Sequence, residues 1–187
     1  MRPPLVSYSE GPSSVTLAVK RPTLRYLDEF MRLTCATDLL LWKVFPNAKE
    51  ITESMAAYSA LRRFCTLSLS DSSVVCVVVG DGCTPRTGAL IACRSDWSVW
   101  SIDPRLKRES RVRRLTTLRE PIEKADFPIP DVVVAVHSHA HTLPNAPLVI
   151  SMPCCVPDPA EHKPTFSYED WGVWSPLRTI NIYREAA

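Results

Sequence analysis

The clearest pattern along the chain is a set of short apolar runs, each followed by a polar turn. Residues 74–79 run directly into Gly80-Asp81-Gly82, and Val132–Val136 is a second fully apolar run. Leu148–Met152 is apolar except for Ser151. Runs of this length without polar alternation are typical of strands that are buried on both faces of a parallel sheet. We therefore predict that these three segments form the centre of such a sheet.

The segments between and around these runs predict the remaining elements. Helical spacing of apolar residues and a capping pair at Asn47 and Glu50 indicate helices, while β-favouring residues between turn signals indicate further strands. The predicted helices cover residues 22–35, 47–65 and 87–94, and the additional strands cover residues 97–103, 115–118 and 179–183. Strands and helices then alternate through the middle of the chain, which predicts an α/β fold with right-handed crossovers.

Length and composition fit one globular domain with an extension before it. The chain has 187 residues, of which 45% are hydrophobic and 22% are charged. Prolines, serines and a glycine dominate its start, so we predict an N-terminal arm over residues 1–22 and a single domain over residues 23–187. Seventeen prolines against five glycines indicate rigid, extended connections.

Cysteine content, hydrophobicity and charge bear on the cellular compartment and the partners of the protein. The seven cysteines are an odd number, and their predicted positions in a strand and at helix ends favour free thiols in a reducing compartment. No stretch approaches the length of about 18 apolar residues that a membrane span needs, and no leader is evident. We expect a soluble intracellular protein, cytoplasmic or nuclear. The net charge of +2 neither requires nor excludes nucleic acid.

The unusual residues of the sequence fall at the carboxyl ends of the predicted strands. Gly80-Asp81-Gly82 ends the first strand, Asp103 the second, His137-Ser138-His139 the fourth and Cys154-Cys155 the fifth. In open α/β sheets, ligands bind at this edge. The glycines allow a ligand to approach the backbone, and amides at the start of the following helix can bind an anion. Asp103 follows the turn by about twenty residues, a spacing suited to ribose hydroxyls.

These motifs resemble those of the S-adenosylmethionine-dependent methyltransferases. The resemblance rests on Gly80-Asp81-Gly82 after an apolar strand and on Ser101-Ile102-Asp103-Pro104 at the end of the next. The segments Val136-His137-Ser138-His139 and Met152-Pro153-Cys154-Cys155 are similar to one branch, which includes a tRNA 2′-O-methyltransferase. The similarity covers roughly residues 48–184. It implies a Rossmann-like, mostly parallel sheet flanked by helices, with the last strand antiparallel at the edge.

The resemblance also implies a cofactor, an acceptor and a set of site residues. The cofactor is S-adenosylmethionine, and the basic segment 105–114 together with the branch suggests RNA as the acceptor. His137 or His139 would act as general base, since a neutral imidazole suits proton removal near pH 7. Arg86 would pair with a ligand carboxylate. The residues expected to bind the cofactor are Gly80, Asp81, Gly82, Thr84, Pro85, Arg86, Thr87, Asp103 and Pro104.

The turn departs from the family pattern at one point. The third glycine of the acidic-x-Gly-x-Gly-x-Gly motif is missing, and Thr84-Pro85-Arg86-Thr87 takes its place. The usual way of holding the amino acid part of the cofactor is therefore altered or lost. This leaves a third interpretation beside methyl transfer and the metal chemistry considered next: a catalytically inactive Rossmann-like module that binds a partner protein or nucleic acid. The short connection between the fourth and fifth strands favours it.

A zinc-dependent hydrolase is the other alternative. His137, His139 and His141 alternate, so on an extended segment all three point to the same side, where Cys154 or Cys155 could join them. No acidic residue accompanies the cluster to activate a metal-bound water. Adjacent cysteines on a strand also point to opposite faces, so that only one would join easily. We therefore assign no metal ligands. The sequence does not indicate an oligomeric state.

Overall fold

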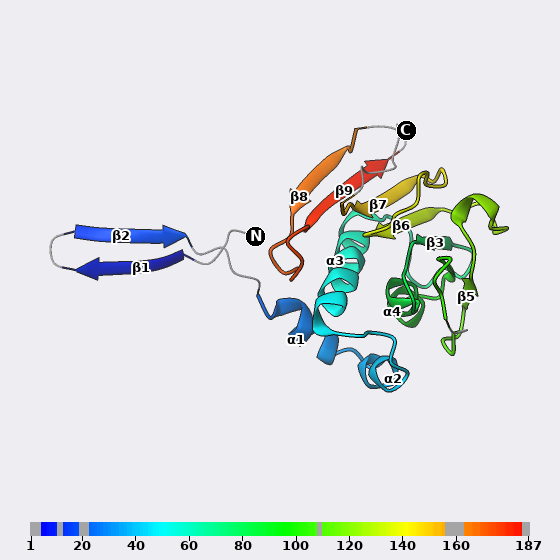
Figure 1. Ribbon diagram of the computed structural model, residues 1–187, viewed down its shortest axis with the longest axis horizontal. Coiled ribbons are helices and arrows are strands. Elements are labelled where there is room, and N and C mark those ends of the chain that lie inside the picture. The colour runs from blue at the N-terminus through cyan, green and yellow to red at the C-terminus, as the bar shows by residue number, and fades with distance from the viewer. Residues whose placement is uncertain (1–4, 11–12, 19–22, 108–109, 156–162, 185–187) are drawn as a thin grey trace.

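The structure is a computed structural model that describes residues 5–10, 13–18, 23–107, 110–155 and 163–184. A seven-stranded sheet in the order β5-β4-β3-β6-β7-β9-β8 forms its centre (Figure 1). The strands are β3 (Val75–Val79), β4 (Ser98–Ile102), β5 (Leu115–Leu118), β6 (Val132–Val136), β7 (Leu148–Met152), β8 (Phe166–Glu169) and β9 (Thr179–Arg184). The predicted α/β, Rossmann-like fold with a mostly parallel sheet is confirmed.

The strand order places the ends of four strands next to one another. β3 pairs in parallel with β4 on one side and with β6 on the other, and β4 pairs with β5 while β6 pairs with β7. The chain thus runs outward from β3 in one direction, then returns and continues in the other. The carboxyl ends of β3 and β6 meet at this reversal, which is where ligands bind in sheets of this kind.

The last strand is antiparallel, as predicted, and belongs to the antiparallel pair at the far edge. β9 pairs with β7 on one side and with β8 on the other, both times antiparallel. β8, which the sequence pattern did not predict, is therefore the outermost strand on this side. Arg63 stacks over the rings of Phe64, Phe166 and Tyr168 at this edge, so that strand β8 is held by an aromatic cluster with α3.

Helices cover one face of the sheet. The helices are α1 (Arg25–Met31), α2 (Ala36–Leu41), α3 (Ala48–Phe64) and α4 (Arg86–Arg94), with a short 3-10 helix η1 (Ile122–Lys124). α3 begins at Asn47, whose side chain accepts a 3.1 Å hydrogen bond from the Glu50 amide, as the capping pattern predicted. α3 and α4 lie against each other on the sheet, and α1 packs on α3 (Figure 1).

The two faces of the sheet differ because side chains alternate along each strand. Cys76 and Val78 of β3 point into the larger core beneath the helices. Val77 and Val79 point into a smaller core, which η1 and the segment after β6 cover through Ile122 and Ala146. The prediction of regular alternation was too simple: among the described crossovers, only that from β3 to β4 contains an α-helix. Prolines interrupt the later connections.

The N-terminal segment forms a separate two-stranded sheet. β1 (Leu5–Glu10) and β2 (Ser13–Ala18) pair only with each other, in antiparallel register. The predicted arm, residues 1–22, lies partly outside the described residues. All seven cysteines lie within the described part and carry free thiols, as predicted. Among the helices of the described part, none combines the length and the apolar character that crossing a bilayer requires.

Candidate functional site

The turn after β3 needs both of its glycines. Gly80 and Gly82 have φ angles of +72° and +84°, in the left-handed region that side chains disfavour. A Cβ atom on Gly80 would lie 2.4 Å from Ser138 Oγ, and one on Gly82 would lie 2.2 Å from the Arg86 guanidinium. Neighbouring groups therefore approach the turn backbone on two sides. These two sides have different characters, and we call them the cavity side and the helix side.

The cavity side holds a recess of about 330 Å³ at the carboxyl ends of the central strands. Its volume lies within the range of small-molecule sites, about 300–1,000 Å³. The walls combine apolar side chains with a few polar groups, as such sites usually do. The lining includes Val79, Gly80, Ile102, Asp103, Pro104, Arg105, Ile122, Ser138, His139 and His141.

Asp103 lies at the wall between the cavity and the turn. Its side chain is only 2% exposed, and one carboxylate oxygen accepts a 2.7 Å hydrogen bond from the Gly82 amide. The other oxygen accepts a 2.7 Å bond from the Arg105 amide. Arg105 Nε also lies 3.5 Å from this second oxygen. A carboxylate has about four accepting positions, so these three contacts leave one for a ligand hydroxyl. Asp103 thus ties the end of β4 to the glycine turn and also lines the cavity.

The helix side begins with Asp81, which is buried against the start of α4. Its carboxylate accepts hydrogen bonds from the Thr87 amide at 2.8 Å, the Gly88 amide at 2.9 Å and the Ser101 hydroxyl at 2.8 Å. The expectation that these amides are free to bind a ligand anion is wrong, because Asp81 already accepts their bonds. Burial raises the pKa of Asp81, while Arg86 and the three donors oppose the rise.

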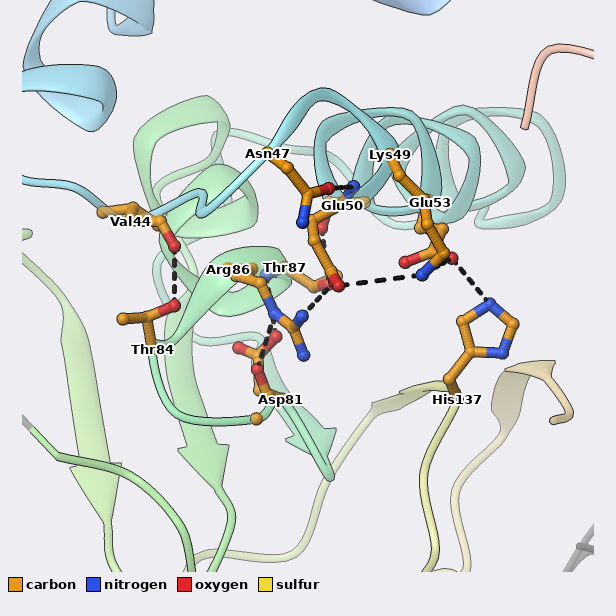
Figure 2. Close-up of polar contacts among 12 residues, drawn as sticks. Val44, Asn47, Lys49, Glu50, Glu53, Asp81, Thr84, Arg86, Thr87 and His137 are labelled. Carbon is orange, nitrogen blue, oxygen red and sulfur yellow. Dashed lines mark hydrogen bonds and ion pairs between the residues drawn. The ribbon is translucent and has the colours of Figure 1, made fainter. Parts of the chain in front are cut away.

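Arg86 fills the space above Gly82. Figure 2 shows its guanidinium between Asp81 and Glu50. Its Nε donates a 3.0 Å hydrogen bond to the Asp81 carbonyl, and its guanidinium forms an ion pair with Glu50 of α3. The side chains of Arg86 and Glu50 are each 18% exposed. The guanidinium that the sequence suggested for a ligand carboxylate is therefore already paired within the protein. Thr84 is also engaged, since its hydroxyl donates to the Val44 carbonyl at 2.6 Å.

His137 lies on the helix side, against a buried acid (Figure 2). Its Nε2 is 3.0 Å from Glu53 Oε1, and Lys49 Nζ is 2.8 Å from the same oxygen. The Glu53 side chain is only 2% exposed. Burial disfavours its carboxylate, but His137 and Lys49 outweigh burial, so the pKa of Glu53 lies below its ordinary value. A carboxylate beside an imidazole orients the ring.

The histidines do not converge as alternation on an extended segment predicted. β6 ends at Val136, and His137 has a left-handed φ of +49°, so its side chain turns to α3. His139 and His141 instead line the cavity. Cys155 Sγ lies 3.7 Å from His139 Nε2 and 3.7 Å from Cys154 Sγ. The two cysteines follow the end of β7, so the alternation of strand side chains does not separate them.

The structure brings only some of the predicted site residues together. Gly80, Asp103, Pro104 and His139 meet at the cavity. The others lie around the start of α4 or on the helix side; Thr84 and Pro85 line a second recess, of about 440 Å³, beside α2. These others are Asp81, Gly82, Thr84, Pro85, Arg86, Thr87 and His137.

Sequence reasoning missed the polar residues that α3 contributes. Glu50 and Glu53 are three residues apart, which places them on one side of the helix, facing Arg86 and His137. The available signal was a polar run, Thr52-Glu53-Ser54, inside a helix whose neighbouring residues are apolar. Each of these three residues is buried, and Ser54 Oγ lies 3.0 Å from Thr87 Oγ1 of α4.

No protein-family model matches the sequence, and no curated protein sequence matches it either.

Proposed function

We propose that this protein is an S-adenosylmethionine-dependent methyltransferase that holds the nucleoside of its cofactor in the cavity. The observation that carries the proposal is the position of the cavity at the reversal of strand order, between Gly80 and the buried Asp103. Ligands of α/β sheets bind at this point, and an acid at the end of the second strand suits ribose hydroxyls. The antiparallel last strand agrees with the resemblance seen in the sequence.

The residues present fit a nucleoside. Ile102 and Ile122 offer apolar surface to a base, and the carboxylate of Asp103 retains an accepting position for ribose. The cofactor would supply a methyl group activated by its sulfonium, so alignment of the acceptor is the chief task of the protein. Of the two predicted bases, His139 lines the cavity, whereas His137 faces Glu53. We therefore assign proton removal to His139.

RNA is the acceptor that we propose. Arg105 lines the cavity, and Lys107, Arg111 and Arg113 are exposed on the segment that follows. Leu106 and Val112 are buried and hold this segment to the domain. Residues 108–109 of the predicted basic segment lie outside the described part. Exposed basic side chains beside a nucleoside cavity suit contacts to phosphates, which position a nucleic acid without reading its sequence.

A second function is favoured by the helix side, namely nucleoside binding without methyl transfer. Asp81 occupies the amides at the start of α4, and Glu50 occupies Arg86. The carboxylate of a methionine moiety would have to displace one of these internal partners. A ligand without that moiety, such as adenosine, meets no such competition.

Calorimetry with S-adenosylhomocysteine and adenosine tests both functions. A ligand at a hundred times its dissociation constant stabilises the fold by about 2.7 kcal/mol, which thermal unfolding also detects. Two variants should impair binding in the cavity in different ways. Asp103→Asn weakens ribose contacts yet keeps one oxygen to accept a backbone bond. Ala140 also lines the cavity, and Ala140→Phe fills the space. Leu41→Ala, in the second recess, is the control.

The outcomes separate the two functions. If S-adenosylhomocysteine binds and both cavity variants lose it, methyl transfer to RNA is then assayed with labelled cofactor. Binding of adenosine alone, without methyl transfer, favours the second function. If neither compound binds, or if both cavity variants bind as the wild type does, both functions are excluded.

A further inference from the structure

We infer that His139, Cys154 and Cys155 form a zinc-binding site at the ends of β6 and β7. One ligand atom from each residue lies within 4.8 Å of the others, and within the described part of the chain this is the one such group of three. The residues that would hold the cofactor, Asp103 and Gly80, are not part of this zinc site. The inference does share His139 with the proposed function. An imidazole nitrogen that binds zinc cannot also remove a proton, so bound zinc excludes His139 as the general base.

Two of the three separations between the ligand atoms match those around a tetrahedral zinc ion, and the third pair lies within 4.8 Å. Zinc bonds of about 2.3 Å to sulfur and about 2.0–2.1 Å to nitrogen place two sulfurs about 3.8 Å apart, and a sulfur and a nitrogen about 3.6 Å apart. The structure has 3.7 Å between the two Sγ atoms and 3.7 Å between Cys155 Sγ and His139 Nε2. Two edges of the tetrahedron are therefore preformed.

The fold holds these residues together for reasons unrelated to a metal. Val136 and Met152 are paired residues at the ends of neighbouring parallel strands, so the segments that follow leave the sheet side by side. The His137 amide then donates a 2.8 Å hydrogen bond to the Met152 carbonyl. Cys154 Sγ lies 3.9 Å from the Ser138 carbonyl. The site therefore requires little additional ordering when a metal binds.

The chemistry of the group selects a soft or borderline cation. Two thiolates and one imidazole suit Zn²⁺, while calcium and magnesium prefer oxygen ligands. His139 and Cys155 are exposed, so a metal ion can reach them from solvent. Three protein ligands leave the fourth tetrahedral position for water or another ligand, as in zinc sites that take part in reactions. His139 also lines the cavity, so the site adjoins it.

A disulfide between the two cysteines is the competing use of the thiols. Their sulfurs are 3.7 Å apart, well beyond the bonded distance of about 2.05 Å. In reduced protein both thiols are available to a metal. Oxidation would remove both sulfur ligands at once, so a zinc site of this composition loses its metal under oxidising conditions.

The test is zinc binding by reduced, untagged protein. Elemental analysis and competition with a chromogenic chelator measure stoichiometry and affinity, and Co²⁺ substitution reports thiolate ligation through sulfur-to-metal charge-transfer absorption. We expect one zinc per chain. His139→Ala, Cys154→Ser and Cys155→Ser should each lower the affinity at least about tenfold, since even loss of a supporting residue costs about 10–100-fold. The triple variant should bind none.

Two control variants remove the same residue types nearby. Cys83 is exposed elsewhere, and His141 lines the same cavity outside the cluster, so Cys83→Ser and His141→Ala should bind zinc as the wild type does. Circular dichroism checks that every variant is folded. Absence of zinc and of the Co²⁺ absorption from folded, reduced wild type overturns the inference. Equal affinity in the wild type and the folded triple variant also overturns it.

Discussion

The two sides of the β3 turn use the same short segment in opposite ways. On the cavity side, Gly80 and Asp103 border an open space, and Asp103 retains an accepting position. On the helix side, Asp81 and Arg86 have their polar groups satisfied by neighbouring protein atoms. The turn is therefore open to a ligand on the cavity side, whereas neighbouring protein groups occupy its polar atoms on the helix side.

The comparison shows that polar groups of a glycine turn can be occupied by partners from the protein itself rather than by a ligand. The amides at the start of α4 have a carboxylate partner, as in a complex with an anionic ligand, but that partner is Asp81 of the protein itself. Substitutions on the helix side should therefore affect stability, and substitutions on the cavity side should affect ligand binding.

The largest effect is expected on the helix side, from Asp81→Ala. The substitution leaves two buried amides and the Ser101 hydroxyl without their acceptor. Each unsatisfied buried group costs about 1–3 kcal/mol, so the free energy of unfolding should fall by about 3 kcal/mol or more. Urea unfolding measures this change. Asp81→Asn keeps one acceptor oxygen and should lose less. A fall below about 1 kcal/mol for Asp81→Ala would show that Asp81 is not a structural cap.

Replacing either glycine of the turn with alanine should lower stability by an intermediate amount, and the two substitutions form a matched pair. Both have positive φ angles, so alanine strains the backbone at either position by about 1–3 kcal/mol. At Gly80 the added Cβ also lies 2.8 Å from the Cα of Ser138, which is fixed backbone. At Gly82 it meets the end of the flexible Arg86 side chain.

Gly80→Ala should therefore destabilise the protein more than Gly82→Ala does. Thermal unfolding of both variants, side by side, measures the difference. Equal losses would indicate that backbone strain alone decides the cost, and that the closeness of Ser138 to Gly80 contributes nothing.

The smallest effect concerns Glu53 and depends on pH. Its pKa lies below the ordinary value of 4.5, so its carboxylate stabilises the folded state above about pH 4.5. This contribution is lost as the pH falls through the lower pKa of the folded state. The melting temperature of the wild type should accordingly fall as the pH drops below about 4.5, and Glu53→Gln should lack part of that fall.

At neutral pH, Glu53→Gln should cost about 1 kcal/mol, the scale of one ordinary intramolecular hydrogen bond. Its affinity for adenosine should equal that of the wild type, because Glu53 lies on the helix side. Identical acid profiles for the two proteins would show that the Glu53–His137 contact does not contribute to stability. If Glu53→Gln lost adenosine binding, the helix side would contribute to the ligand site, and the two sides would not be functionally separate.

Local sequence predicted much of the fold because buried parallel strands carry an unmistakable apolar signal. The predicted strands at 74–79, Val132–Val136 and Leu148–Met152 coincide with β3, β6 and β7. The cap at Asn47 likewise marked the start of α3, since capping involves residues only three apart. β8 was missed because the prolines and polar residues around it have no strand periodicity.

The site was harder to predict because its contacts join residues that are far apart in the sequence. The pairing of Arg86 with Glu50 spans 36 residues. His137 and Glu53 are farther apart still, by 84 residues (137 − 53), and they meet because β6 lies beneath α3. The sequence placed the glycines and Asp103 at one edge of the sheet, which the strand order confirms. The polar run Thr52-Glu53-Ser54 indicated that α3 buries polar side chains, but not which residues they would contact.

The position of β9 has a consequence for how the chain folds during its synthesis. β9 follows β7 and β8 in the chain, yet it lies between them and hydrogen-bonds to both. Until residues 179–184 emerge, β8 has no neighbour in the sheet, and β7 exposes an unpaired edge. Such an edge invites association with other chains while folding is incomplete. The sheet is completed when β9 inserts between two strands that precede it in the chain, so residues 179–184 determine when the edge of β7 is covered.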